Sequence, residues 1–296
     1  MTVRLILFFS LTISLHAGSG ETGFAFLKIN ASARSSAMGE VSTYDGQDPM
    51  GVLVNPANLS VTPSHSVAFT YNRWIESTDY QAFSGKFKTG SWAWSLYYLY
   101  TGVDDIPQRD IPSEEPTAYF SSHDLAIGFV LSRALNDRWF AGIGTKYIYE
   151  RIQNTVTAWA WDGGLYYVPN ETWRAGFSFQ NLGRSGKLID ERIRLPFQVR
   201  LSGGYTVYRQ ENRHRADLMA DVIKTYGASP RLHTGSEYVF QEKVCIRLGY
   251  VWGYASRNIS AGVGLIFQRR MRLDYAWTPF TNSLGSSHRI SAGFDF

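Results

Sequence analysis

The sequence predicts an all-β protein: a transmembrane antiparallel β-barrel of about 14 strands with a short N-terminal plug segment. Three observations carry this prediction. Segments of roughly ten residues with alternating apolar and polar or small side chains recur along the chain, and they exceed the five or six residues typical of soluble strands. Aromatic residues stand near the ends of these segments, as membrane barrels place them. The opposite faces carry Gly, Ser, Arg, Asp and Gln, which suit a wet or plugged lumen.

The composition narrows the class of protein. Charged residues make up 18% of the 296 residues, below the roughly 25% of ordinary soluble domains. The mean hydropathy of -0.20 fits no helical membrane protein. Cys245 is the one cysteine, which rules out an internal disulfide framework and any multi-cysteine metal site. The net charge is +4 with scattered basic residues, so no nucleic-acid partner is expected.

Residues 1–20 read as a secretory signal peptide. Arg4 supplies the positive start, residues 5–15 form an apolar stretch, and small residues follow from Ala17. A stretch of this length is too short to cross a hydrocarbon core of about 30 Å as a helix. The mature chain is therefore expected to be exported.

Residues 21–63 differ from the rest of the chain. They lack the two-residue alternation of apolar and polar side chains that marks the strands. They are rich in Ala, Gly and Ser and are prone to form helix. Small side chains allow tight packing in a narrow space, and Asn55-Pro56 suits a turn. A segment of this composition suits the interior of a narrow barrel. Gating and simple filling of the lumen remain the two alternatives for its role.

Residues 64–296 form the predicted outer-membrane barrel. The candidate strands are 64–74, 79–88, 91–101, 118–132, 138–150, 154–167, 172–181, 196–208, 214–224, 231–240, 242–253, 257–268, 270–279 and 287–296. The longest connections, 102–117 and 182–195, are both odd-numbered, whereas most even-numbered connections are short. Long external loops and short periplasmic turns are typical of outer-membrane barrels. The last strand ends in Phe296, resembling the signal that the bacterial barrel-assembly machinery reads.

The alternation assigns a face to each side chain. Leu248 and Val263 fall on the apolar, lipid-facing side, and Cys245 and Gly249 on the lumen side. We therefore expect Leu248→Arg to impair assembly and Gly249→Ser to matter less. Asp217 and Asp221 share a face with Met219 and are expected in the lumen, with a transport role as one alternative. Four tryptophans are expected in the interfacial girdles: Trp74, Trp139, Trp252 and Trp277.

The sequence contains no recognisable catalytic or metal-binding constellation. Ser121, Ser122, His123 and Asp124 are adjacent, but neighbouring strand residues face opposite ways and cannot form a triad. The histidines lack paired metal-ligand spacing, and no phosphate-binding loop is present. We expect no enzymatic activity, no metal and no cofactor.

Several motifs together resemble one family. They are residues 23–29 (GFAFLKI), 32–40 (SARSSAMGE), 55–59 (NPANL), 195–200 (LPFQVR), 273–280 (LDYAWTPF) and 288–291 (HRIS). These residues look like the signature of the PorV/PorQ family, which are FadL-like outer-membrane barrels. The family pattern has Gly where Glu40 and Asn58 stand here, and Asp45 and Asp48 occupy its acidic stretch. The resemblance implies that residues 21–63 fold inward as a plug, whose motif comprises Arg34, Met38, Gly39, Asn55, Pro56 and Ala57.

The resemblance implies a location in the bacterial outer membrane and a non-enzymatic role in type IX-like protein secretion and surface attachment. Outer-membrane lipid surrounds such a barrel, and secreted cargo proteins or secretion-system subunits are its partners. The partner surface is expected on the outer loops, with apolar contacts and backbone edges for a strand-like ligand. The candidate residues are Asp104, Asp105, Ile106, Pro107, Ile111 and Pro112.

Two other functions remain open. A FadL-like channel for uptake of hydrophobic small molecules predicts an apolar pocket near the plug and a lateral opening in the wall. A soluble secreted β protein, such as a lectin or a propeller, predicts that the chain is not extracted with membranes.

Overall fold

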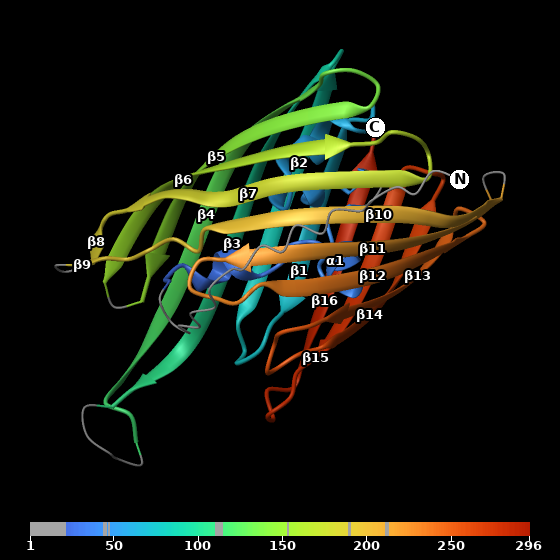
Figure 1. Cartoon of the computed structure of the whole chain (residues 1–296). Coiled ribbons are helices and arrows are strands. Elements are labelled where there is room, and N and C mark those ends of the chain that lie inside the picture. The colour runs from blue at the N-terminus through green and yellow to red at the C-terminus, as the bar shows by residue number, and fades with distance from the viewer. Residues whose placement is uncertain are drawn as a thin grey trace, which may run out of the picture.

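The computed structural model describes residues 22–43, 46, 48–109, 115–152, 154–188, 191–210 and 213–296. Fourteen antiparallel strands close into one barrel, in which β1 pairs with both β2 and β16 (Figure 1). The prediction of an antiparallel barrel of about 14 strands is thus confirmed. Closure pairs each strand of the wall with a neighbour on both sides over most of its length, so most backbone N–H and C=O groups there are paired within the protein.

The strands of the barrel follow one another around the wall, with a small hairpin inserted between β7 and β10. Their bounds are β1 (Ser66–Arg73), β2 (Asp79–Thr89), β3 (Trp92–Gln108), β4 (Ala118–Ala134), β5 (Trp139–Arg151), β6 (Thr155–Tyr167), β7 (Trp173–Ser185), β10 (Gln198–Gln210), β11 (His214–Thr225), β12 (Arg231–Phe240), β13 (Val244–Val251), β14 (Ile259–Phe267), β15 (Met271–Pro279) and β16 (Ser286–Asp295). The inserted hairpin consists of β8 (Lys187–Leu188) and β9 (Glu191–Arg192).

Two expected loops begin as strand instead. We expected a loop from residue 102 and another from residue 182, but β3 continues to Gln108 and β7 to Ser185. Pairing of β2 with β3 ends at Gly102, whereas β3 and β4 continue to pair as far as Gln108 and Ala118. The two strands therefore form a ribbon that projects beyond the rim. A ribbon of this kind forms because each strand supplies the backbone partners of the other.

The expected alternation of faces is confirmed along the wall. Leu248 and Val263 expose 58% and 50% of their surface on the outside, whereas Cys245 is buried on the inside. At the ends of strands, Trp139 stacks on Tyr167 and Trp173 packs against Tyr205. Because the outer face is a continuous array of exposed apolar side chains, the barrel matches a hydrocarbon environment. Among the residues described, no helix combines the length and hydropathy needed to span a bilayer.

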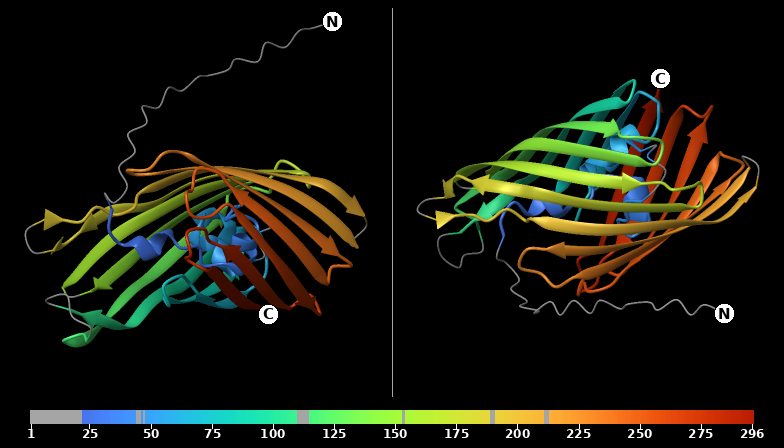
Figure 2. Two further views of the ribbon diagram at one scale, coloured as in Figure 1. Left: turned by 90° about the horizontal axis from the view of Figure 1, so that it is seen from below. Right: turned by 45° about the horizontal axis from the view of Figure 1, so that its top comes forward.

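The described residues of the N-terminal segment, 22–43, 46 and 48–63, lie inside the barrel (Figure 2). The segment contains the short helices η1 (Ala25–Lys28), α1 (Ala33–Ala37), η2 (Pro49–Leu53) and η3 (Pro56–Ser60). Three of them begin at a polar cap, since Ser32, Asp48 and Asn55 accept hydrogen bonds from backbone N–H groups two or three residues later. Pro49 and Pro56 occupy first helical positions, where the missing N–H costs nothing.

The N-terminal segment packs against inward-facing glycines of the wall. A Cβ added at Gly249 would overlap the backbone of Met38 and Gly39, and one at Gly142 would overlap the backbone of Pro56. A Cβ at Gly164 would overlap the side chain of Asn55. The absence of side chains at these points lets the backbone of the N-terminal segment lie directly against the strands.

The structure reverses our expectation for Gly249. We predict that Gly249→Ser displaces the N-terminal segment at a cost of about 1–3 kcal/mol, because the added atoms overlap backbone that cannot rotate away. Limited trypsin cleavage after Arg34, which is buried in the parent, measures the displacement. Gly203→Ser is the matched control, since a Cβ there meets nothing within 4 Å. Equal cleavage of the two variants would contradict the prediction.

Candidate functional site

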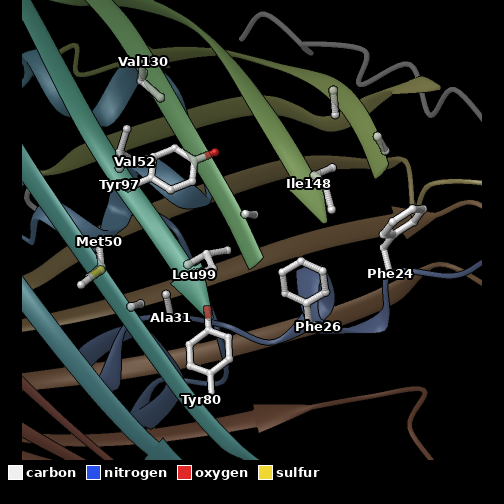
Figure 3. Packing of buried hydrophobic residues seen from close by; sticks show 14 of the residues in the cluster. Phe24, Phe26, Ala31, Met50, Val52, Tyr80, Tyr97, Leu99, Val130 and Ile148 are labelled. Atoms are coloured by element: carbon white, nitrogen blue, oxygen red, sulfur yellow. The ribbon is translucent and has the colours of Figure 1, made fainter. Parts of the chain in front are cut away.

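A cavity of about 750 Å³ lies at the end of the barrel that carries the long hairpins. One wall is the start of the N-terminal segment, including Phe26 and Ala31, and another is β3 with Tyr97 and Leu99 (Figure 3). Its volume falls within the range of roughly 300–1,000 Å³ found for small-molecule sites. Trp74, which we expected in an outer girdle, lines this cavity and packs edge-on against Phe280. That residue lies just past the end of β1, where the chain turns over the rim.

Polar side chains gather at one side of the cavity. Arg257 donates two hydrogen bonds to the carboxylate of Glu40, at 2.5 and 2.9 Å. Burial by itself raises the pKa of Glu40, but the charge and hydrogen bonds of Arg257 outweigh it and lower the pKa to about 2. The ionised carboxylate therefore contributes stability above its unfolded pKa near 4.5, and this is lost only as the pH falls towards 2.

A second group of charges fills the lumen towards the opposite end of the barrel. Glu237 accepts from Arg34 at 2.6 and 2.9 Å, from Arg247 at 2.7 Å and from Arg215 at 3.2 Å. Arg247 also pairs with Asp274 at 2.7 Å. A smaller cavity of about 440 Å³ lies beside this network. The lumen thus changes along its axis, from a cavity lined by both apolar and polar side chains at the long-hairpin end to a charged network below it.

The residues of the predicted plug motif all lie in the lumen, at three separate places. Arg34 joins the Glu237 network, and Met38 and Gly39 lie against β12 and β13. Asn55 donates through its side-chain amide to the carbonyls of Leu165 on β6 and Phe177 on β7. Pro56 starts η3, and Ala57 packs with Phe140 and Tyr166.

The structure corrects the expected loop position of the partner-binding candidates. Asp104, Asp105, Ile106 and Pro107 lie on β3, in the part that forms the projecting ribbon with β4. The register of the pair shifts between Val103 and Ile106, and Asp105 has a φ of 56°. The shift bulges the strand and leaves Asp104 and Asp105 exposed. Ile111, Pro112 and Asp45, like residues 1–20, lie outside the described residues.

Some residues of the site escaped the sequence prediction. Glu237 is one of them, whereas Arg247 and Asp274 lie on the polar strand faces that the alternation placed in the lumen, as it did Asp217 and Asp221. Those two are confirmed inside, where Asp217 pairs with Arg174 and Asp221 with Arg200, at 2.7 and 2.8 Å. No sequence signal links Glu40 to Arg257, because 217 residues separate them.

Comparison with solved structures identifies the fold. The Pseudomonas putida toluene transporter TodX is 11% identical and superimposes with a TM-score of 0.59, covering 88% of this chain and 97% of that chain. The Ralstonia pickettii toluene transporter TbuX is 12% identical, with a TM-score of 0.57 over 88% of this chain and 96% of that chain. A FadL homologue from Pseudomonas aeruginosa is 11% identical, with a TM-score of 0.57 over 90% and 98%.

This chain therefore has the fold of FadL-like outer-membrane barrels. At these identities the likeness is one of fold, and the similar structures named above are transporters or a homologue of FadL rather than enzymes. No protein-family model and no curated protein matches the chain.

Proposed function

We propose that this protein is an outer-membrane channel for hydrophobic small molecules. The observation that carries the proposal is the cavity of about 750 Å³ between the N-terminal segment and the wall. It holds apolar side chains from both sides, among them Phe26, Leu27, Leu99 and Ile223. The channel hypothesis predicted a pocket at this place, beside a lumen-filling segment; polar and charged side chains such as Lys28, Asp124 and Arg200 line it together with the apolar ones. The toluene transporters TodX and TbuX, which share the fold, support it.

The route out of the cavity follows from where the wall is weakest. Below the cavity the lumen is blocked by the N-terminal segment and by the Glu237 network, through which an apolar molecule cannot pass without breaking buried ion pairs. On one side, β7 and β10 pair only up to Gln180 and Gln198, while β7 continues to Ser185. We propose that hydrophobic molecules leave sideways at this seam.

The seam is closed by a short stretch of chain, residues 193–197. The side-chain amide of Asn181 donates to the carbonyl of Pro196 at 2.9 Å, and Ser185 donates to that of Ile193 at 2.6 Å. Gly23 of the N-terminal segment donates its N–H to Arg194. A few side-chain bonds hold this stretch in place of a strand ladder, and they break at lower cost than a continuous ladder.

We predict that Val103→Trp lowers uptake of radiolabelled toluene at least about fivefold in cells carrying the chain in the outer membrane, since Val103 is half-buried at the mouth of the cavity. Val207→Trp is the matched control, because Val207 is 53% exposed on the outer face. Similar uptake by Val103→Trp and the parent, with equal amounts of folded barrel, would overturn the proposal.

The proposal includes the division of the chain into a cleaved signal peptide at 1–20, a plug at 21–63 and a barrel at 64–296. Residue 22, the first of the described segment, precedes the helices that occupy the lumen. N-terminal sequencing of the protein purified from the outer membrane tests the cleavage. A mature protein that begins at Met1 would remove the signal peptide from the proposal.

A second candidate function is the PorV/PorQ-like role in type IX secretion. The projecting ribbon of β3 and β4 favours it, since residues 103–108 of β3 have no β2 partner and present a backbone edge to a strand-like ligand. Removing residues 104–118 in a host with such a system tests this role. Loss of surface-attached cargo with unchanged toluene uptake supports secretion, and the reverse result supports the channel.

A further inference from the structure

Glu40 holds an unfavourable backbone conformation at the end of α1. Its φ of 66° lies in the left-handed region, which is unfavourable for a residue with a side chain and readily adopted by glycine. The preceding residue, Gly39, has a φ of 69° and is a glycine. Strain at a non-glycine residue persists only where its surroundings compensate for it, and such positions cluster at functional sites. The contacts that the Glu40 side chain makes explain why this position holds a glutamate and not a glycine.

The carboxylate of Glu40 contacts the loop at the tip of the β13–β14 hairpin, called the 252–258 hairpin below, which lies outside the strands of the wall. Residues 252–258 connect β13 to β14 at the long-hairpin end, and Arg257 lies within them. The fork-to-fork pair of Arg257 and Glu40 is largely buried, with 12% and 9% of the side chains exposed. A bidentate pair of this kind is stronger and more directional than a single hydrogen bond. It joins the N-terminal segment directly to the hairpin.

The rest of the polar group reinforces this junction. His233 donates through Nδ1 to the carbonyl of Gly39 at 2.6 Å, so its Nε2 accepts from the hydroxyl of Tyr254 at 3.1 Å. The ring of Tyr254 has Arg231 and Arg257 at 3.9 and 4.6 Å from its centre. Tyr254 is thus held by His233 and Arg231 of β12 on one side and by Arg257, the ion-pair partner of Glu40, on the other.

Both partners of the junction lie in the wall of the cavity. Glu40, Tyr254, Ser256 and Arg257 are among the residues that line it. On its other side the hairpin is held by the neighbouring hairpin, where the N–H of Thr281 donates to the carbonyl of Ser256 at 2.8 Å. The hairpin is therefore held towards the lumen by Arg257 and Tyr254, and at the rim by Thr281, whose hydroxyl also donates to the carbonyl of Ala255 at 3.1 Å.

We propose that Glu40 and Arg257 form a latch that holds the 252–258 hairpin over the cavity, so that the hairpin and the N-terminal segment are released together. Loss of the ion pair frees Arg257 to reach solvent and removes one of the contacts that hold the strained Glu40 residue, beside the hydrogen bonds from Arg200 to its carbonyl and from its N–H to Ser35. The link works in both directions, since either partner restrains the other. That release admits a ligand rests on the proposed channel function; the latch itself does not.

Two variants of Glu40 separate the latch from backbone strain. Glu40→Gly removes the carboxylate and suits the left-handed backbone, whereas Glu40→Gln removes the charge and keeps the strain. We expect hydrogen–deuterium exchange at residues 252–258 to rise about tenfold or more in both variants of the purified full chain, with exchange in β14 and β15 unchanged. Glu40→Gly is expected to retain the heat-modifiable barrel and to lose less thermal stability than Glu40→Gln, because glycine relieves the strain.

Arg257→Gln provides the reciprocal test. It is expected to raise exchange at 252–258 to the same extent and to speed trypsin cleavage after Lys28 and Arg34 in the N-terminal segment. The double variant Glu40→Gln/Arg257→Gln is expected to match each single variant. Asp79→Asn is the control, since it removes an exposed ion pair with Arg73 at the same end of the barrel.

Unchanged exchange at 252–258 in Glu40→Gly, or additive effects in the double variant, would overturn the latch. These measurements use the protein without ligand, so they stand whether or not the chain carries toluene. Normal latch behaviour with no toluene uptake by the parent would reject the channel and keep the latch. Toluene uptake that Val103→Trp abolishes, with exchange unaffected by Glu40→Gly, would do the opposite.

Discussion

Glu237→Gln is expected to lower the stability of the folded protein by about 3–5 kcal/mol, the typical cost of removing one partner from a buried ion pair. The Glu237 carboxylate is 1% exposed and accepts hydrogen bonds from Arg34, Arg215 and Arg247. Glutamine keeps the shape but removes the charge that the three guanidinium groups share. Because Arg34 belongs to the N-terminal segment, the loss also weakens the docking of that segment in the lumen.

The measurement is the temperature at which the folded band disappears from SDS gels, together with trypsin cleavage after Arg34. Glu242→Gln is the matched control, since its partner Arg269 is 76% exposed and such pairs contribute about 0–1 kcal/mol. A Glu237→Gln protein as heat-resistant as Glu242→Gln would show that the buried network does not hold the segment.

Leu248→Arg is expected to reduce the yield of folded barrel, because an arginine facing lipid costs about 2–4 kcal/mol near the midplane. Leu248 is 58% exposed on the outer face and lies opposite Ser236 and Ala261 on the neighbouring strands. The yield is measured as the heat-modifiable fraction in the membrane. The defect should be one of assembly, since the position does not contact the N-terminal segment.

Leu135→Arg makes the same change outside the strands. Leu135 lies in the short turn after β4 and is 55% exposed, so its exposure matches that of Leu248. Full folding of Leu135→Arg beside impaired folding of Leu248→Arg is the expected pair of results. Equal yields for Leu248→Arg and the parent would refute the assignment of the outer face to lipid.

Much of the barrel was predictable because strand geometry imposes a period of two on the side chains. That period assigned Leu248 and Val263 to the outside and Cys245, Asp217 and Asp221 to the lumen, as the structure has them. The parity of long and short connections indicated the even number of strands. Each inference needed only residues close together in the chain, which explains why it succeeded without three-dimensional information.

The same local reasoning misplaced residues that lie where strands end. Trp74 was expected in an outer girdle, but just beyond β1 the alternation stops and its ring turns into the cavity. The ribbon of β3 and β4 was expected to be a loop, since Asp104, Asp105 and Pro107 are poor strand formers. Pairing with β4 overrides that preference, as each strand is the backbone partner of the other.

The amino-acid order alone thus specified the barrel, its two faces and a small-residue segment suited to its interior. Folding decided which lumen residues meet. In the sequence Gly249 looks like any other small residue of a strand. The structure shows that it must be small because the backbone of Met38 and Gly39 lies against it. Glu40 and Arg257 become partners only when the segment enters the lumen and the barrel closes around it. Periodicity is local and can be read along the chain, whereas a contact across 217 residues depends on the closed tertiary structure.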